Sequence, residues 1–185
     1  MLPTGSRVLD VGCGNGYIAH HLSSLLRADV AGIDLEHKTE SAINYRQYNG
    51  SRFPIKDQSF DAALLCYVLH HTQDVTIVLT ELRRVLREGG LAVVYEDIPE
   101  AGWDLLVCAI HDRKWRNRTG PCTFRTKEEW RSVFAANGFE VIFERRLSRW
   151  RNAAHPVARR CYLVKIGNKA IHEITRNGKK AVPTA

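Results

Sequence analysis

The most informative part of the sequence is RVLDVGCGNG, which covers residues 7–16. A short apolar run with β-branched residues is followed at once by three glycines, and residues 17–26 then carry apolar side chains at helical spacing. The predicted order is a strand, a glycine turn and a helix. Glycines in such a turn allow a ligand to approach the backbone closely, and the first turn of a helix offers unpaired N–H groups to an anion.

A second strand is predicted at residues 29–34, and it ends in Asp34, 22 residues after Gly12. An acidic side chain at this place can accept hydrogen bonds from ribose hydroxyls. The glycine turn and Asp34 together indicate a nucleoside-containing cofactor at the carboxyl edge of the sheet. A dinucleotide is disfavoured, because Tyr17 stands where pyrophosphate sites use a small residue.

Strands and helices continue to alternate along the chain. Apolar patterns predict further strands at residues 44–49, 60–67, 91–95, 139–143 and 161–166, and helices at residues 75–86, 104–115 and 126–136. Gly89 and Gly90 are predicted to end the helix at 75–86 with a left-handed cap. The alternation predicts an α/β fold, in which a doubly wound, mostly parallel sheet carries helices on both faces.

The composition is that of an ordinary globular domain, with 44% hydrophobic and 25% charged residues in a chain of 185. Its apolar runs are too short to cross a bilayer, so no transmembrane segment is predicted. The five cysteines are an odd number without CxxC spacing, which predicts free thiols in a reducing compartment and therefore a cytoplasmic protein.

Positive charge gathers in the second half of the chain. Residues 1–100 carry 9 Lys and Arg against 13 Asp and Glu, and residues 101–185 carry 18 against 7, which together give the net charge of +7. Such a distribution indicates an anionic substrate, nucleic acid or a membrane surface. The alternative is a solvated basic face with a basic tail, which we expect to be flexible and to cover residues 169–185.

Residues 8–16 resemble the first motif of the class I S-adenosylmethionine-dependent methyltransferases. The resemblance continues in order through Ile33-Asp34-Leu35, Arg52–Ile55 with Ser59–Asp61, Leu69–His71, Leu82–Gly90, and Phe124–Thr126 with Trp130 and Gly138-Phe139. It covers residues 7–166. It implies a seven-stranded Rossmann-like sheet with an antiparallel last strand, with S-adenosylmethionine as cofactor and S-adenosylhomocysteine as its product.

The resemblance also implies roles for single residues in the glycine turn. The backbone of Gly12, Cys13 and Gly14 would approach the methionine part of the cofactor. Asp10, at the end of the first strand, would orient the turn and reach the cofactor's amino group.

Further roles follow for residues beyond that turn. Asp34 would bind both ribose hydroxyls, and Leu35 would pack on the adenine. Asn49 stands where the family often has an Asp that accepts from the adenine amino group. Tyr67 would line the methionine side. The alternatives are a strand-end turn residue for Asp34 and a packed core aromatic for Tyr67.

Methyl transfer from a sulfonium requires no nucleophilic side chain, so the sequence identifies no catalytic residue. A general base is needed only if the acceptor holds its proton. The candidates are His70, His71, Glu96 and Asp97 near the carboxyl edge, and His111-Asp112 in the next helix. Of these, His71, Glu96 and His111 are expected to face the substrate, and solvated or hydrogen-bonded surface groups are the alternative. No metal site is predicted, because the adjacent side chains of His70 and His71 point apart on a strand or helix.

The resemblance favours a small-molecule acceptor, which could be anionic. Residues 67–70 read Tyr-Val-Leu-His in place of the Asn/Asp-Pro-Pro-Tyr motif of nucleic-acid methyltransferases. An RNA methyltransferase remains an alternative, as does a cofactor-binding module without catalysis. The latter is suggested by the first strand's position near residue 1, which leads us to expect a single domain at residues 1–168 without the family's N-terminal helices. The sequence predicts no oligomeric state.

Overall fold

The computed structural model describes residues 3–36, 41–151 and 155–167. The predicted tail at 169–185 lies outside the described residues. The strands are β1 (Arg7–Val11), β2 (Asp29–Asp34), β3 (Asn44–Gln47), β4 (Phe60–Cys66), β5 (Leu86–Asp97), β6 (Phe139–Leu147) and β7 (Arg159–Ile166). The helices are α1 (Tyr17–Leu26), α2 (Val75–Val85), α3 (Gly102–Thr119) and α4 (Lys127–Ala136), with short 3₁₀ turns η1 (Leu69–His71) and η2 (Arg149–Arg151).

The described residues form one seven-stranded sheet in the order β3-β2-β1-β4-β5-β7-β6. Strands β1 to β5 pair in parallel, whereas β7 runs antiparallel to both of its neighbours, β5 and β6. The predicted doubly wound sheet with an antiparallel last strand is therefore confirmed. The strand order reverses between β1 and β4, and ligands of such sheets bind at this point, outside the carboxyl ends of the strands.

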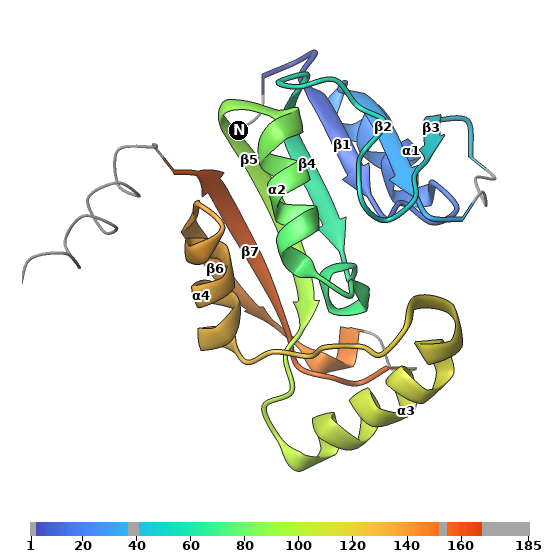
Figure 1. Ribbon diagram of the computed structural model, residues 1–185, viewed down its shortest axis with the longest axis vertical. Helices are drawn as coiled ribbons and strands as arrows, with labels where there is room; N and C mark the ends of the chain where they lie inside the picture. The colour runs from blue at the N-terminus through green and yellow to red at the C-terminus, as the bar shows by residue number, and fades with distance from the viewer. Residues whose placement is uncertain (1–2, 37–40, 152–154, 168–185) are drawn as a thin grey trace, which may run out of the picture.

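Helices cover both faces of the sheet, as predicted (Figure 1). Side chains alternate along β1, so that Leu9 packs in a large core with α2 and α4, and Val8 packs in a smaller core with Ala19 of α1. The apolar positions of α2 all face the large core; they are Val75, Val78, Leu79, Leu82 and Val85. This burial at helical spacing is what the sequence pattern predicted for that segment.

The junction between α2 and β5 differs from the prediction. Helix α2 ends at Val85, and Leu86 is already extended, 1% exposed and paired with Phe60 of β4. Gly89 has a φ of +72° but lies within the irregular start of β5, where the register against β4 shifts. The predicted glycine cap is wrong because Leu86 enters the core and the sheet before the glycines are reached.

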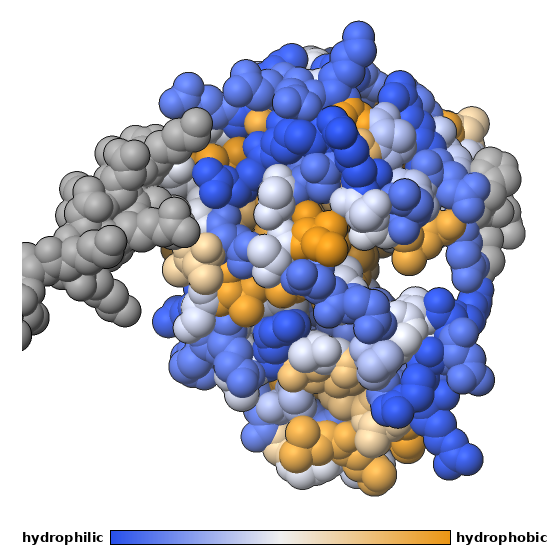
Figure 2. All heavy atoms as spheres, viewed as in Figure 1, coloured by the Kyte–Doolittle hydropathy of each residue, from blue (hydrophilic) through white to orange (hydrophobic). Residues whose placement is uncertain are grey.

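Helix α3 crosses beneath the carboxyl ends of β4 and β5 (Figure 1). It begins earlier than predicted, because the buried carboxylate of Asp104 accepts hydrogen bonds from the backbone N–H groups of Glu100 and Ala101 and pairs with Arg149. It also ends later than predicted, at Thr119, where the N–H of Gly120 donates to the carbonyl of Arg116. Four large apolar side chains of this helix are more than half exposed, namely Trp103, Leu105, Leu106 and Ile110. Figure 2 shows apolar side chains gathered at the lower end of the molecule, where α3 lies.

The sequence also predicted free cysteines and no transmembrane segment. All five cysteines lie in the described residues and carry free thiols. Within the described part of the chain, no helix has the length and apolar character that a membrane span requires.

Candidate functional site

The glycine turn joins β1 to α1, and its backbone needs glycine. Gly12 and Gly14 have φ angles of +71° and +55°, in the left-handed region. A Cβ atom at Gly12 would lie 2.5 Å from Cγ2 of Val68, whereas no described atom beyond the chain neighbours would lie within 4 Å of a Cβ at Gly14. Gly12 therefore permits close packing against the segment after β4, and Gly14 borders open space.

Asp34, at the end of β2, faces this turn. Its Oδ2 accepts a hydrogen bond from the backbone N–H of Gly14 at 2.8 Å, and its Oδ1 accepts one from the N–H of Glu36 at 3.2 Å. The carboxylate is only half-buried, so further lone pairs of its oxygens can accept from a ligand. The structure thus brings together the glycine turn and the acid that the sequence spacing linked.

Asp10 provides a test of whether a cationic ligand fits beside the turn. Its side chain is 2% exposed, and no donor among the described residues reaches its Oδ2. Burial, reinforced by the negative charge of Asp34, raises the pKa of Asp10 to about 7. A buried carboxylate without a donor is costly. The amino group of a ligand would relieve that cost, so these residues fit the cofactor that the sequence resemblance implies.

Leu35 and Asn49 lie at the far end of the same edge. Leu35 is 43% exposed and lies next to Gly50, where a Cβ would be 3.5 Å from the Leu35 Cδ2. Asn49 Oδ1 accepts hydrogen bonds from the N–H and the hydroxyl of Ser51, at 3.1 and 2.7 Å. A hydrogen bond from adenine to that oxygen would therefore compete with the two hydrogen bonds that it already accepts from Ser51.

Cys13 contributes its backbone and not its thiol to the rim of the turn. The side chain is buried against β2, with Sγ 2.6 Å from the position of a Cβ at Gly32. Its backbone N–H donates to the carbonyl of Ile33 at 3.1 Å. The buried sulfur lies 4.0 Å from the carbonyl oxygen of Gly14, on the inner side of the turn.

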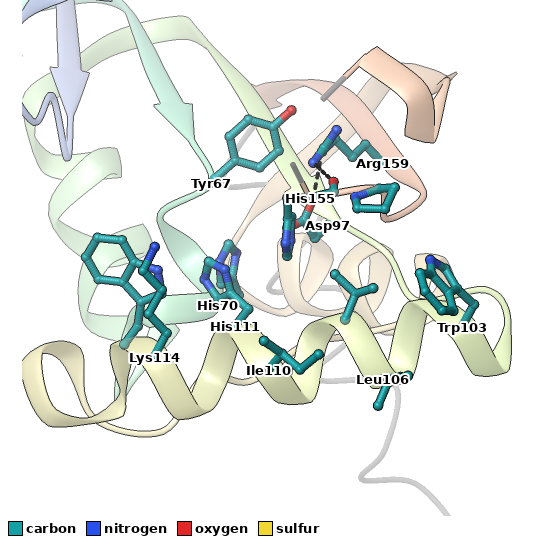
Figure 3. A pocket seen from close by; sticks show the side chains of 13 residues that line it. Tyr67, His70, Asp97, Trp103, Leu106, Ile110, His111, Lys114, His155 and Arg159 are labelled. Atoms are coloured by element: carbon teal, nitrogen blue, oxygen red, sulfur yellow. Dashed lines mark hydrogen bonds and ion pairs between the residues drawn. The ribbon is translucent and has the colours of Figure 1, made fainter. Parts of the chain in front are cut away.

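A cavity of about 590 Å³ opens beside this edge, between the ends of β4, β5 and β7 and the helix α3 (Figure 3). Its apolar side is formed by Trp103, Leu106, Val107 and Ile110 of α3. The remaining lining residues are Tyr67, His70, Asp97, His111, Lys114, Trp115, His155, Pro156 and Arg159. The cavity is therefore apolar along the helix and polar along the strand ends.

Tyr67 connects the turn to the cavity. It follows β4 with a φ of +59°, a strained conformation for a bulky residue and one that clusters at functional sites. The guanidinium of Arg159 lies 5.4 Å from its ring centroid, and the next residue, Val68, contacts the turn at Gly12. With 37% of its surface exposed, Tyr67 is not the packed core aromatic that was the alternative.

An ionic group forms one end of the cavity. Asp97 is 2% exposed and is held by Arg159 Nε at 2.9 Å and by His155 Nε2 at 2.8 Å (Figure 3). Burial raises the pKa of Asp97, but the hydrogen bond and charge of His155 and the charge of Arg159 outweigh it, so the net pKa is lowered. The sequence did not single out His155, or Arg159 by itself; the antiparallel return of β7 brings both to this edge.

The predicted substrate-facing residues divide into three cases. His111 lines the cavity. His71 lies behind it, with the two Nε2 atoms 3.2 Å apart. Glu96 does not reach the cavity: it is fully buried, and its oxygens accept from the N–H of Leu69 and contact Nδ1 of His70 at 2.6 Å. Side chains alternate along β5, so Glu96 points into the core and its neighbour Asp97 points to the cavity.

The sequence argument against a metal site assumed that the side chains of His70 and His71 point apart, and the structure shows that they do not. In the 3₁₀ turn η1 the rings of His70 and His71 do not diverge, and their centroids are 4.3 Å apart. Burial, together with the charges of His70 and His111, lowers the pKa of His71 to about 3. Burial and the charges of His70 and His155 lower the pKa of His111 to about 4. Both imidazoles are therefore neutral at physiological pH.

Comparisons with known proteins point to one family. Residues 9–94 match the family described as a methyltransferase domain. The 27-O-demethylrifamycin SV methyltransferase of Amycolatopsis mediterranei is 34% identical over 105 residues, 49% of this chain and 39% of that protein. The tRNA U34 carboxymethyltransferase of Nautilia profundicola is 27% identical over 121 residues, 60% of this chain and 40% of that protein. The chain thus spans about two fifths of the length of these curated relatives.

A solved structure shows the same fold over nearly the whole chain. A SAM-dependent methyltransferase from Methanosarcina mazei superimposes with a TM-score of 0.70, covering 91% of this chain and 95% of the other at 20% sequence identity.

Proposed function

The chain belongs to the class I S-adenosylmethionine-dependent methyltransferase family, and from this premise we propose that it transfers a methyl group to a small, largely apolar acceptor bound under α3. The observation that carries the proposal is the position of the cavity. It shares the carboxyl edge of the sheet with the glycine turn, and Tyr67 and Val68 connect the two. An acceptor in the cavity would therefore lie next to the cofactor.

S-adenosylmethionine is the cofactor of this family, and when bound it supplies a methyl group already activated for in-line displacement. In this chain we assign Asp34 to the ribose hydroxyls and Asp10 to the amino group of the methionine part. The open space at Gly14 supports this assignment, as does the Asp10 oxygen that lacks a donor among the described residues. Leu35 would cover the adenine. Positioning the two reactants is the main contribution that the protein makes.

The lining of the cavity supports an acceptor that is apolar along most of its length. Val107 and Ile110 provide a wall that gains from burying apolar surface. Lys114, which is exposed at the rim, offers a positive charge to an acidic group of the acceptor. Arg159 is held against Asp97, so it would contribute orientation more than net charge.

The site must also account for the proton on the acceptor's reacting atom, and this limits which acceptors it suits. His111 follows Ile110 of the apolar wall along α3 and lines the cavity, and its lowered pKa of about 4 makes it a weak base. Acceptors that ionise readily, or whose reacting atom carries no proton, fit such a site best. A phenol or an organic acid belongs to this class, and an aliphatic alcohol does not.

A tRNA substrate is the second candidate function. It is supported by the similarity to the tRNA U34 carboxymethyltransferase and by the basic excess in residues 101–185. The apolar wall of α3 favours the small molecule, since nucleic-acid surfaces are met mainly by basic and stacking side chains. The cytoplasmic location stays a prediction from the free cysteines.

Two measurements on the full chain test the proposal. Calorimetry with S-adenosylhomocysteine should show binding to one site, and the absence of heat at millimolar ligand would overturn the cofactor assignment. Transfer from methyl-labelled S-adenosylmethionine should then reach members of a panel of phenols and aromatic acids, with bulk tRNA as the comparison. Transfer to tRNA alone, with affinity that falls steeply as salt rises, would favour the second candidate. Cofactor binding without transfer to any acceptor would indicate a non-catalytic module.

A further inference from the structure

Three histidines meet at the wall of the cavity. His70 and His71 come from η1 and His111 comes from α3, and one nitrogen of each lies within 4.8 Å of the other two. Figure 3 shows His70 and His111 side by side, and their ring centroids are 5.4 Å apart. The three rings therefore converge on one point from two elements that are distant in the sequence.

The orientation of His70 is fixed from behind. Its Nδ1 lies 2.6 Å from Oε2 of Glu96, so the carboxylate holds a proton on that nitrogen and leaves Nε2 as the nitrogen that can bind a ligand. His70 is fully buried, and its Nε2 finds no hydrogen-bond partner among the described residues. A carboxylate behind a histidine whose other nitrogen is free is the usual support of a metal ligand.

His71 and His111 add two more nitrogens at a suitable spacing. Their Nε2 atoms are 3.2 Å apart. Two nitrogens bound to one tetrahedral ion at about 2.0–2.1 Å lie roughly 3.3–3.4 Å from each other. The Nδ1 of His71 lies 3.1 Å from the hydroxyl of Thr119, which can hold the proton on that side.

We propose that His70, His71 and His111 bind a divalent transition-metal ion such as Zn²⁺ through their Nε2 atoms. Imidazole nitrogens suit this class of ion, and three histidines with one open position form a common tetrahedral site. Because His70 and His111 line the cavity, the open position faces it. The ion would bind an oxygen atom of the molecule that occupies the cavity. This inference does not depend on methyl transfer, because ion binding can be measured without cofactor or acceptor.

The test uses the full chain, free of any histidine tag and stripped with a chelator. Titration with Zn²⁺ against a chromophoric chelator should show one equivalent bound. Replacing Zn²⁺ by Co²⁺ should give the intense visible absorption of a tetrahedral ion. His111→Ala should lower the affinity by at least about a hundredfold, and Glu96→Gln, which still offers an oxygen to the N–H of Leu69, by about ten- to a hundredfold.

The matched control is the exposed pair His20 and His21 on α1, whose ring centroids are 6.2 Å apart. The double variant His20→Ala/His21→Ala should bind Zn²⁺ like the wild type. If His111→Ala fails the check of its circular dichroism spectrum, His71→Ala takes its place, and the cobalt spectrum of the wild type needs no variant at all.

Three results would overturn the proposal. The first is the absence of stoichiometric binding to the wild type. The second is an equal loss of affinity in the His20/His21 control. The third is a sulfur-to-cobalt charge-transfer band that disappears in Cys122→Ser, because Cys122 Sγ lies 3.3 Å from Nδ1 of His71 and would then be a ligand in place of the all-histidine set.

Discussion

The carboxylate of Asp34 accepts a hydrogen bond from the backbone N–H of Gly14, with 2.8 Å between oxygen and nitrogen. Gly14 belongs to the turn after β1, whereas Asp34 is the last residue of β2. Their contact fixes the distance between the turn and the acid before any ligand arrives. Such preorganisation reduces the entropic cost of binding a ligand that spans both.

This relationship predicts the effect of removing the carboxylate. Asp34→Ala should weaken the binding of S-adenosylhomocysteine by at least about a hundredfold, because two charge-assisted hydrogen bonds to hydroxyls are lost. Asp29 is the matched control, since it lies at the other end of β2 in an exposed pair with Arg7. Asp29→Ala should bind like the wild type in calorimetry. Equal losses in the two variants would place the ligand elsewhere.

The two glycines of the turn should respond differently to alanine. Gly14→Ala keeps a left-handed backbone at a cost of about 1–2 kcal/mol, meets open space, and should fold but lose cofactor binding. Gly12→Ala places a Cβ atom 2.5 Å from Cγ2 of Val68, so it should lower the midpoint of thermal unfolding clearly more than Gly14→Ala does. Thermal unfolding and calorimetry on both variants check this. Undiminished binding in Gly14→Ala would show that the space beside it is not used.

Asp10 should make cofactor binding depend on pH. Burial and the charge of Asp34 raise its pKa to about 7, and binding of a cationic amino group needs the ionised carboxylate. Below about pH 7, Asp10 must therefore release a proton when the ligand binds. The dissociation constant of S-adenosylhomocysteine should fall by up to about tenfold per unit from about pH 5 to about pH 7 and then level off.

The stability of the free protein should change with the opposite sign. The pKa of Asp10 in the folded chain lies above its ordinary value of 3.8, so the folded chain holds a proton that the unfolded chain has released. This group's contribution to stability is therefore lost as the pH rises from about 4 to about 7. Asp10→Asn should remove both dependences. Binding that stays equally steep in this variant would assign the pH effect to another group.

The local parts of the site could be predicted from the sequence, and the parts made by distant segments could not. The bounds of β1, α1 and β2 were predicted because each is set by its own pattern of apolar residues and glycines. The pairing of Arg159 with Asp97 depends on the return of β7 to the carboxyl edge, and no local pattern encodes that return. The sequence also could not distinguish the buried Glu96 from a residue facing the cavity.

The convergence of the histidines depended on geometry that sequence spacing does not contain. Adjacent side chains diverge on a regular helix or strand, which was the reason to exclude His70 and His71 as a pair. The short turn η1 and the crossing helix α3 bring His71 to 3.2 Å from His111. A separation of 40 residues in the sequence gave no indication of this contact.

Helix α3 offers a direct test of where the acceptor binds. Ile110 is 62% exposed and lines the cavity, whereas Leu105, 60% exposed on the same helix, is not among the described residues that line it. Ile110→Trp should fill the cavity and raise the KM for the acceptor by at least about tenfold, since even one methylene in an apolar pocket is worth about 1–3 kcal/mol. The affinity for S-adenosylhomocysteine should not change, because the glycine turn is untouched. Leu105→Trp adds the same bulk outside the cavity and should leave both quantities as they are, so an equal rise of KM in the two variants would move the acceptor away from this cavity.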